Sequence, residues 1–363
     1  MMTDPISMAF LFEKINQHFD QRMPFVVYNK PNAAAIIAVF QKNNTLYCIE
    51  DFNEKGFVLA PFDGDEIVLI PENQSEIVMA NCEATSSNEP FFEFNEREDD
   101  KAKSKYLNLI QKGITAIEKG IFGKVVLSRK ESIALSNFEL TVVFKKVVQS
   151  YPTAFSYCFF HPKVGLWLGA FSEQLLQVKS KDFKTMAVAG TQKFQKNSKV
   201  IWETKEKEEQ QFVTDFILDN IKEYVSNSTI SEPYTLKAGN LLHIKTDIQG
   251  ILKAPTHLKE VLDILHPTPA VCGFPKAIAK DFILKNEGYD REYYSGFLGE
   301  FNFDFKNKEN NTELYVNLRC MKIDFENAKA NLFVGGGITK DSIPEDEWIE
   351  TVNKSKTMIK VLV

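Results

Sequence analysis

The chain has 363 residues, of which 44% are hydrophobic and 25% charged, and its formal net charge is −6. Such a composition is typical of a globular protein that buries a large core. The negative balance argues against a general nucleic-acid binder, which needs a basic surface to displace counterions.

The N-terminal segment, residues 1–20, predicts a short amphipathic helix and lacks the cationic and apolar regions of a secretory signal. Nowhere does the chain approach the run of about 18 apolar residues that a membrane span needs. The five cysteines are scattered without a CxxC pair and the five histidines are dispersed, which argues against a zinc site and suits a reducing compartment. We therefore expect a cytoplasmic protein with no membrane and no nucleic-acid partner.

The weakest part of the pattern is residues 81–105, which are polar and charged. We interpret this stretch as a surface connection between a variable N-terminal part, residues 1–100, and a core that begins near Tyr106. Because the stretch is too short and too mixed to separate two domains, we expect one domain over residues 1–363, with the motif-bearing core in residues 101–363.

Short strand-like runs recur through the core, and each is β-branched or aromatic and bounded by Gly, Pro or Asn. They are residues 124–128, 154–160, 164–170, 174–178, 184–189, 240–245, 313–319 and 331–334. Several of these runs follow one another without an intervening helix. This order favours an α+β fold over a doubly wound parallel sheet.

Helix-like segments lie between and after these runs. In residues 203–225 an apolar stripe follows one face; its members are Val213, Ile217, Ile221, Tyr224 and Val225. Residues 275–288 open with Pro275 and close with Gly288, the usual asymmetry of a helix start and stop. The last helix is expected to begin at Ser342, where SIPE forms a capping-box pattern.

Glu209 continues the apolar stripe of residues 203–225 toward the helix start, and Glu206 lies one turn earlier. A carboxylate directed toward the core costs free energy unless it is paired or binds a metal. The charge-rich run around these glutamates also fits a solvated helix end, and the spacing alone favours that interpretation.

Glu350 and Lys354 lie four residues apart on the last helix, the spacing of an ordinary surface ion pair, and Glu347 lies one turn before Glu350. The preceding GGGITKDS run begins with three glycines after a strand, which would let backbone N–H groups approach an anion closely. A tight strand-to-helix turn explains these glycines about as well.

Residues 265–275 contain three prolines, which would stiffen a loop that forms the wall of a pocket. Arg319 ends the run 313–319, and Tyr315 and Asn317 share its face. A guanidinium at that place would suit two-point binding of a carboxylate. A strand-end arginine is more often simply exposed, so each of these signals is weak alone.

Eight motifs together occur in the order seen in chorismate-utilising enzymes. They are KVVLSRK (124–130), GAFSEQLL (169–176), AVAGTQ (187–192), EEQQFVTD (208–215), LHPTPAVCGFP (265–275), REYYSGFLGEF (291–301), VNLRC (316–320) and GGGITKDSIPEDEWIETVNK (335–354). The chain resembles this family, which includes isochorismate synthases and proteins like anthranilate synthase component I, over about its last 260 residues. The resemblance implies one α+β domain of two stacked antiparallel sheets flanked by helices.

The resemblance also implies a site for Mg2+ and chorismate. Two glutamates of the family hold Mg2+, an ion that prefers oxygen ligands, and they correspond to Glu209 and Glu350. The substrate-binding positions that it implies are Thr191, His243, Ala270, Arg319, Gly335, Gly336, Gly337 and Lys354. For His243 a buried structural histidine is an equally good interpretation.

The same resemblance makes Lys124 the catalytic base and Glu173 the catalytic acid. Lys124 would activate water for attack at C2 of the ring, and Glu173 would protonate the departing C4 hydroxyl. A free lysine is protonated at neutral pH, so we expect burial to lower the pKa of Lys124 and to keep Glu173 protonated.

Three positions bear on the product. Ammonia-using members of the family carry glutamine where this chain has Lys124, and the aminodeoxychorismate branch often carries a lysine where it has Ala189. Salicylate synthases tend to have threonine at the position of Ala270, so the resemblance implies conversion of chorismate to isochorismate. A salicylate synthase and a chorismate-binding module without activity remain the alternatives.

The sequence departs from the family pattern at Gln210, usually histidine, at Gln192, usually arginine, and in GGGI, more commonly GAGI. None of these changes removes a predicted metal ligand or the acid–base pair. Monomers are common among isochorismate synthases, so we expect a monomer. The pathway served, whether menaquinone, siderophore or salicylate synthesis, stays open.

Overall fold

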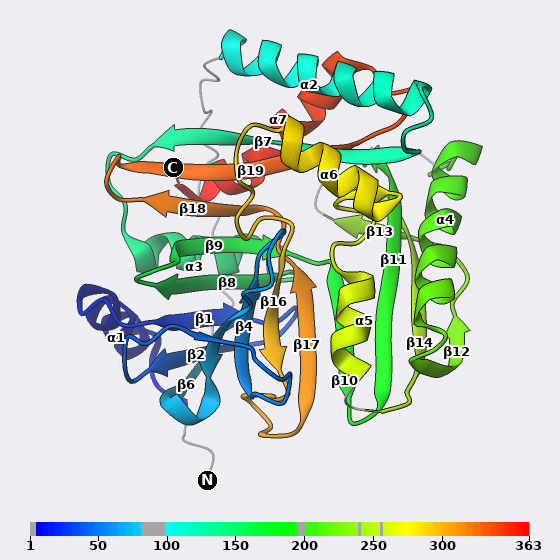
Figure 1. Ribbon diagram of the computed structural model, residues 1–363. Helices are drawn as coiled ribbons and strands as arrows, with labels where there is room; N and C mark the ends of the chain where they lie inside the picture. Colours follow the sequence, from blue (N-terminus) through cyan, green and yellow to red (C-terminus); the bar gives the residue numbers. More distant parts are fainter. Residues whose placement is uncertain (1–4, 82–98, 195–199, 239–240, 255–256, 363) are drawn as a thin grey trace.

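The computed structural model describes residues 5–81, 99–194, 200–238, 241–254 and 257–362. Two antiparallel β-sheets form the centre of the molecule and helices cover them (Figure 1). The expected α+β fold of two stacked antiparallel sheets is therefore confirmed. Within the described residues, no helix is both long and apolar enough to cross a membrane.

Sheet A has nine strands. In spatial order they are β15 (Gly273–Phe274), β7 (Lys124–Ala134), β19 (Lys329–Ile338), β18 (Cys320–Asp324), β9 (Gly165–Phe171), β8 (Phe155–His161), β1 (Phe25–Asn29), β2 (Ala35–Gln41) and β6 (Ser75–Asn81). Some neighbours are consecutive strands, but others, such as β7 with β19 and β1 with β8, are far apart in the chain, so distant segments lie side by side.

Sheet B has ten strands. In order they are β12 (Val225–Ile230), β14 (Leu241–Leu252), β11 (Asp182–Lys193), β10 (Gln174–Lys179), β17 (Asn311–Val316), β16 (Phe297–Phe301), β4 (Gly56–Ala60), β5 (Val68–Pro71) and β3 (Tyr47–Cys48), and β13 (Tyr234–Ala238) pairs with β14.

Helices close the outer faces of both sheets. The helices packed on sheet A are α1 (Met8–Asp20), α3 (Leu140–Ser150) and α7 (Pro344–Leu362), and those on sheet B are α4 (Thr204–Ile221) and α5 (Leu258–Leu265). The helices α2 (Asp100–Glu118) and α6 (Lys276–Asn286) pack near β7, and a short 3-10 helix spans Glu72–Gln74. The expected amphipathic N-terminal helix is α1, with Ser7 as its N-cap.

Strand β1 illustrates why the core has several layers. Its residues alternate between two apolar environments: Phe25 and Val27 pack toward the helices, and Val26 and Tyr28 pack toward sheet B. Successive side chains of a strand point to opposite faces, so a strand covered on both sides is apolar throughout. The cluster between the sheets is rich in aromatic rings, including Phe57 of β4.

The N-terminal part is woven into both sheets. Strands β1, β2 and β6 belong to sheet A, and β3, β4 and β5 belong to sheet B. Of the expected surface connection, residues 82–98 lie outside the described residues, and residues 100–105 form the start of α2. The N-terminal strands thus complete the same two sheets that carry the core motifs.

The glycine-rich segment differs from the sequence expectation. Gly335, Gly336 and Gly337 are not in a loop but in β19, where they pair with β7 at Ser128, Leu127 and Val126. Long-range pairing with β7 extends the strand through the glycines, and the turn to α7 follows them. The predicted capping box at Ser342 is also wrong. Helix α7 begins at Pro344, and the Ser342 hydroxyl donates to Glu347 Oε1.

Arg319 does not end a strand either. Strand β17 stops at Val316, and Arg319 lies in the connection to β18 with a positive φ of 44°. This connection carries the chain from sheet B to sheet A, and buried Asn317 fixes it through hydrogen bonds with Tyr157 and the Tyr293 carbonyl. Arg319 therefore lies at the junction between the two sheets.

Candidate active site

A cavity of about 440 Å³ opens where the two sheets meet α4 and α7. Eleven of the twelve predicted site residues line it: Lys124, Glu173, Glu209, His243, Ala270, Arg319, Gly335, Gly336, Gly337, Glu350 and Lys354. The twelfth, Thr191, lies in β11, and its side chain is outside the described part of the structure. Residues spread over most of the core thus converge on one place.

Lys124 begins β7 and points into the cavity toward α4. Its ammonium group forms an ion pair with Glu209 Oε1 across 85 positions of sequence. Gly337 lies beside it on β19, where an added Cβ would be 3.1 Å from Lys124 Cε. The bare backbone of Gly337 therefore leaves the lysine side chain its path into the cavity.

Lys354 and Glu350 form an ion pair along α7, with Nζ 2.5 Å from Glu350 Oε1. Lys354 Nζ also donates to the Gly335 carbonyl oxygen at 2.8 Å, which ties α7 to β19. Burial alone would raise the pKa of Glu350, but Lys354 and Arg319 outweigh it and lower the pKa below its usual value. The carboxylate of Glu350 is thus ionised at neutral pH.

Glu173 lies just before β10 on the cavity wall. Burial raises its pKa to about 7, against the opposing effects of Arg319, Lys124 and Lys354. A carboxyl with this pKa is protonated in a large share of molecules at neutral pH. It can therefore donate a proton, whereas Glu350 in the same cavity cannot.

Arg319 and His243 supply two further polar groups. Burial lowers the pKa of Arg319 somewhat, but an arginine stays charged. Burial, with Lys354 and Arg319 nearby, lowers the pKa of His243 to about 4, so its ring is neutral. Because Nδ1 lies 3.1 Å from the Gly190 carbonyl oxygen, which can only accept, Nδ1 carries the proton.

Besides Glu173, four glutamates line the cavity, and they are Glu206, Glu209, Glu347 and Glu350. Glu206 Oε2 is buried and has no hydrogen-bond partner within the described residues. The Gly336 backbone leaves room for two of the others, because an added Cβ would lie 3.0 Å from Glu347 Oε2 and 3.6 Å from Glu350 Oε1. An orphaned carboxylate oxygen among further carboxylates fits a hard cation such as Mg2+.

No tight group of three His, Cys, Asp or Glu side chains occurs in the described ranges. Mg2+ commonly takes only one or two protein carboxylates and completes its shell with water and substrate oxygens. The pair Glu209 and Glu350 is therefore compatible with Mg2+ but not with a closed structural zinc site.

Several lining residues were missed in the sequence. Tyr294 lines the cavity close to β19, since an added Cβ on Gly335 would lie 3.0 Å from the Tyr294 hydroxyl oxygen. Because Tyr294 lies inside the REYYSGFLGEF motif, that motif was the signal that could have identified it. Tyr151, Thr153 and Lys237 also line the cavity. They lie outside every recognised motif, and only the packing of α3 and β13 brings them there.

The departures from the family pattern differ in kind. Gln210 is buried and its amide donates to Thr214 Oγ1 at 2.9 Å and to Thr246 Oγ1 at 2.6 Å. It therefore binds α4 to β14. Gln192 lies in β11, and its buried amide nitrogen has no hydrogen-bond partner in the described part of the chain.

Comparison with known proteins agrees with this architecture. The sequence is similar to isochorismate synthase EntC from Escherichia coli (strain K12), with 29% identity over 248 residues. The match covers 66% of this chain and 62% of that relative, so it spans less than two thirds of the relative's length.

Two solved structures have the same fold. DhbC from Bacillus anthracis superimposes with a TM-score of 0.78 at 22% identity, covering 97% of this chain and 99% of that one. MenF, the menaquinone-specific isochorismate synthase from Escherichia coli, superimposes with a TM-score of 0.77 at 20% identity, covering 99% and 100%. The family model for chorismate binding enzymes matches residues 64–363. The chain therefore belongs to the chorismate binding enzyme family.

Proposed function

We propose that this protein is an isochorismate synthase, which converts chorismate to isochorismate. The observation that carries the proposal is that Lys124 and Glu173 meet in one cavity with Arg319 and Lys354. A general base, a general acid and two cations are what an allylic exchange of hydroxyl groups on a dianionic substrate needs. The similarity to proteins named isochorismate synthases supports the same activity.

In the proposed reaction, Lys124 accepts a proton from water as the water oxygen bonds to C2 of the ring. The double bond shifts, and the bond between C4 and its hydroxyl oxygen breaks. Glu173 gives its proton to the leaving hydroxyl, which departs as water. One water enters and one leaves, so the product is an isomer of chorismate.

The pKa of Glu173, raised to about 7, supports its role as the acid. Hydroxide is a poor leaving group. A protonated Glu173 side chain near C4 would donate its proton to the departing hydroxyl, which then leaves as water. Arg319 and Lys354 would hold the carboxylates of the substrate, and the N–H groups of the glycines on β19 would line the same pocket.

For the metal, we propose that Glu209 and Glu350 hold Mg2+, beside Glu206 and Glu347. When bound, the ion would offset the repulsion between these carboxylates and a carboxylate of the substrate. Without such a cation, Lys124 and Lys354 neutralise the two proposed ligands, as their ion pairs indicate.

Glu350→Ala tests the metal assignment. We expect this variant to bind both Mg2+ and chorismate more weakly, because it loses a ligand and leaves Lys354 unpaired. Isothermal titration with Mg2+ gives the affinity without relying on turnover. An unchanged Mg2+ affinity would show that Glu350 is not a ligand.

The second candidate is a salicylate synthase, which would eliminate pyruvate from bound isochorismate. Lys124 is compatible with both reactions, and Ala270 on the cavity wall favours release of isochorismate. A chorismate-binding module without activity is the third possibility, but it would not need Lys124 and Glu173 in the same cavity. A cytoplasmic location, a monomeric state and the absence of a nucleic-acid partner remain predictions.

The deciding experiment incubates the purified protein with chorismate and Mg2+ and separates the products by liquid chromatography with mass detection. We expect a product isomeric with chorismate, which disappears with EDTA and does not change with ammonium. Salicylate with pyruvate would establish the second candidate. Anthranilate would contradict the argument from Lys124, and unchanged chorismate would contradict the proposed activity.

A further inference from the structure

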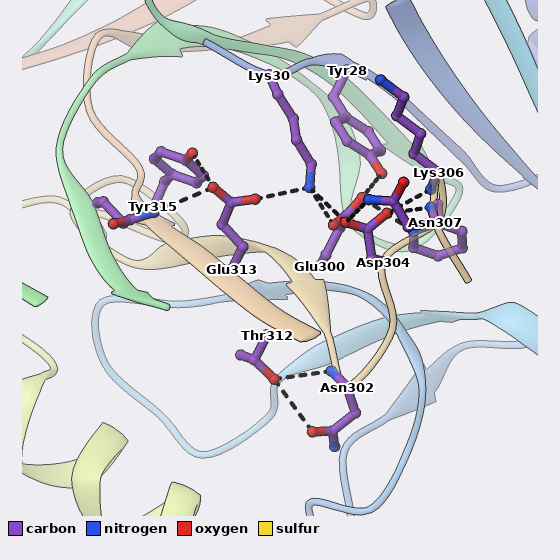
Figure 2. A network of polar contacts seen from close by, with 12 residues as sticks. Tyr28, Lys30, Glu300, Asn302, Asp304, Lys306, Asn307, Thr312, Glu313 and Tyr315 are labelled. Atoms are coloured by element: carbon purple, nitrogen blue, oxygen red, sulfur yellow. Dashed lines mark hydrogen bonds and ion pairs between the residues drawn. The ribbon is translucent and has the colours of Figure 1, made fainter. Parts of the chain in front are cut away.

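A largely buried charged network around Lys30 joins the two sheets (Figure 2). Lys30 directly follows β1 of sheet A, and its ammonium group reaches into sheet B. Nζ lies 2.6 Å from Glu300 Oε2 on β16 and 2.8 Å from Glu313 Oε2 on β17. A lysine of the N-terminal part thus contacts residues of two strands that lie 270 and 283 positions away in the chain.

Glu313 connects Lys30 with residues that lie nearer the cavity. Its second oxygen, Oε1, accepts hydrogen bonds from the Tyr315 hydroxyl at 2.7 Å and from the Gln174 amide at 3.3 Å. Figure 2 shows the Glu313 carboxylate between Lys30 and Tyr315. One carboxylate therefore connects Lys30 on one side with Gln174 on the other.

Gln174 is the residue after Glu173, and the strand pairing is irregular at this point. The register between β10 and β17 shifts between Gln174 and Leu176. A bulge of this kind re-aims neighbouring side chains, and it leaves the strand less firmly held by its ladder. The Glu173 carbonyl oxygen accepts the Val316 amide at 2.9 Å, and the Gln174 side chain adds the next contact.

Stability alone does not account well for this arrangement. Three carboxylates, Glu300, Asp304 and Glu313, surround Lys30, and Glu300 is fully buried. Burying such charges costs desolvation, and apolar residues of similar size often stabilise a core as much or more. What the charges add is directional contacts that fix one relative position of strands β1, β16 and β17.

We propose that Lys30, Glu313 and Gln174 are positioning residues that hold Glu173 in the cavity, which gives the N-terminal part of the chain a role in the reaction. This inference rests on the role proposed above for Glu173. The network orients the strand start from which Glu173 projects. None of the three residues contacts the reacting atoms.

The first test compares Gln174→Met with Gln177→Met. Both glutamines are half-buried on β10. Gln177 pairs in register with Glu313, but no hydrogen bond joins the two side chains in the described structure, whereas the Gln174 amide donates to Glu313 Oε1. We expect Gln174→Met to lower kcat by about 10- to 100-fold with little change in KM, since a small misplacement of a catalytic group has costs of this order. Gln177→Met should keep both constants.

The second test measures hydrogen exchange at the Val316 amide, which reports on the backbone bond to Glu173 without requiring turnover. Exchange at Val316 should become faster in Gln174→Met and stay unchanged in Gln177→Met. Lys30→Met should give the same acceleration. Its matched control is Lys14→Met, which removes the partly exposed ion pair with Glu76 elsewhere in the N-terminal part.

The outcomes separate this inference from the proposed function. If the wild-type protein forms no isochorismate, the proposed function fails, and Val316 exchange still decides whether the network holds the Glu173 backbone. If Gln174→Met keeps wild-type kcat and Val316 exchange, the positioning role is wrong. Equal losses of kcat, binding and thermal stability in Gln174→Met and Gln177→Met would show that the network only stabilises the fold, which would contradict the positioning role.

Discussion

At the scale of single residues, two glutamates of one cavity have opposite protonation. Glu173 has a pKa raised to about 7 by burial, and Glu350 has a lowered pKa because Lys354 and Arg319 outweigh its burial. Arg319 and Lys354 act on both carboxyls, but Lys354 forms a direct ion pair with Glu350, whereas burial prevails at Glu173. Such separation of pKa values is how one site holds both a proton donor and an anion.

The raised pKa of Glu173 gives a pH dependence with a definite sign. The acid must be protonated to act, so kcat/KM should fall as pH rises through about 7. Glu173→Gln should lower kcat by about 10²- to 10⁴-fold and lose this alkaline decline. Initial rates measured between about pH 6 and 9 check both points, and a flat wild-type profile would contradict the assignment.

Lys124→Ala should separate catalysis from binding. The variant loses the proposed base, so we expect turnover to fall by about 10²- to 10⁴-fold. Arg319 and Lys354 remain, so chorismate binding measured by calorimetry should persist. Lys130→Ala, which changes an exposed lysine of the same strand, is the control. Near-normal kcat in Lys124→Ala would show that another group is the base.

At the scale of elements, β19 and α7 form the site together. The glycines of β19 lie against β7 on one side and under the glutamates of α7 on the other. Lys354 joins the two elements through the Gly335 carbonyl oxygen. Arg129 of β7 adds a second connection, because its guanidinium lies 4.3 Å from the Trp348 ring centre and Nε donates to Thr351 Oγ1.

Alanine at two neighbouring glycines should have different effects. In Gly335→Ala the new Cβ would lie 2.7 Å from the Leu127 carbonyl oxygen, which is backbone and cannot yield easily. We expect a loss of about 1–3 kcal/mol in the free energy of unfolding. In Gly336→Ala the nearest atom, at 3.0 Å, is the end of the Glu347 side chain. Alanine also lowers the entropy of the unfolded chain, which offsets the cost of moving the Glu347 side chain. We therefore expect the free energy of unfolding of Gly336→Ala to stay within about 1 kcal/mol of the wild-type value.

Urea unfolding of the two variants checks this prediction. The family pattern GAGI places alanine at the position of Gly336, which agrees with the milder expectation. If Gly336→Ala is the more destabilised variant, then the Glu347 side chain is held more firmly than the hydrogen bond from Ser342 indicates.

At the scale of the whole molecule, buried charge between the sheets links stability to pH. Burial raises the pKa of Glu300 to about 7, against the effects of Lys30 and the Tyr28 hydroxyl. The folded protein then holds a proton that the unfolded chain releases at lower pH. Stability from this group is present below the unfolded pKa and is lost as pH rises through about 7.

The contribution of Glu300 to the free energy of unfolding should therefore decrease between about pH 5 and 7, whereas the lowered pKa of His243 acts in the opposite direction. Glu300→Gln should remove about 1.4 kcal/mol per pH unit from that slope, which is the contribution of one proton. Urea titrations at several pH values measure the slope, and Glu76→Gln, an exposed residue, is the control. Equal slopes in wild type and Glu300→Gln would mean that Glu300 stays ionised in the folded state.

The sequence alone was sufficient to predict the fold class, the strands β7 to β11, four of the helices and the residue types of the site. Alternating and helical patterns are local, so the runs at β7 to β11 and the stripe of α4 could be read directly. The family resemblance was sufficient to identify eleven residues that line one cavity.

Tertiary structure decided what depends on contacts between distant segments. Pairing with β7 turned the expected glycine loop into strand β19, and the crossing between sheets placed Arg319 in a left-handed conformation. The pKa of Glu173 and the contact from Lys30 to Glu313 also arise only after folding. Burial and long-range pairing set these features, and neither has a local signature in the sequence.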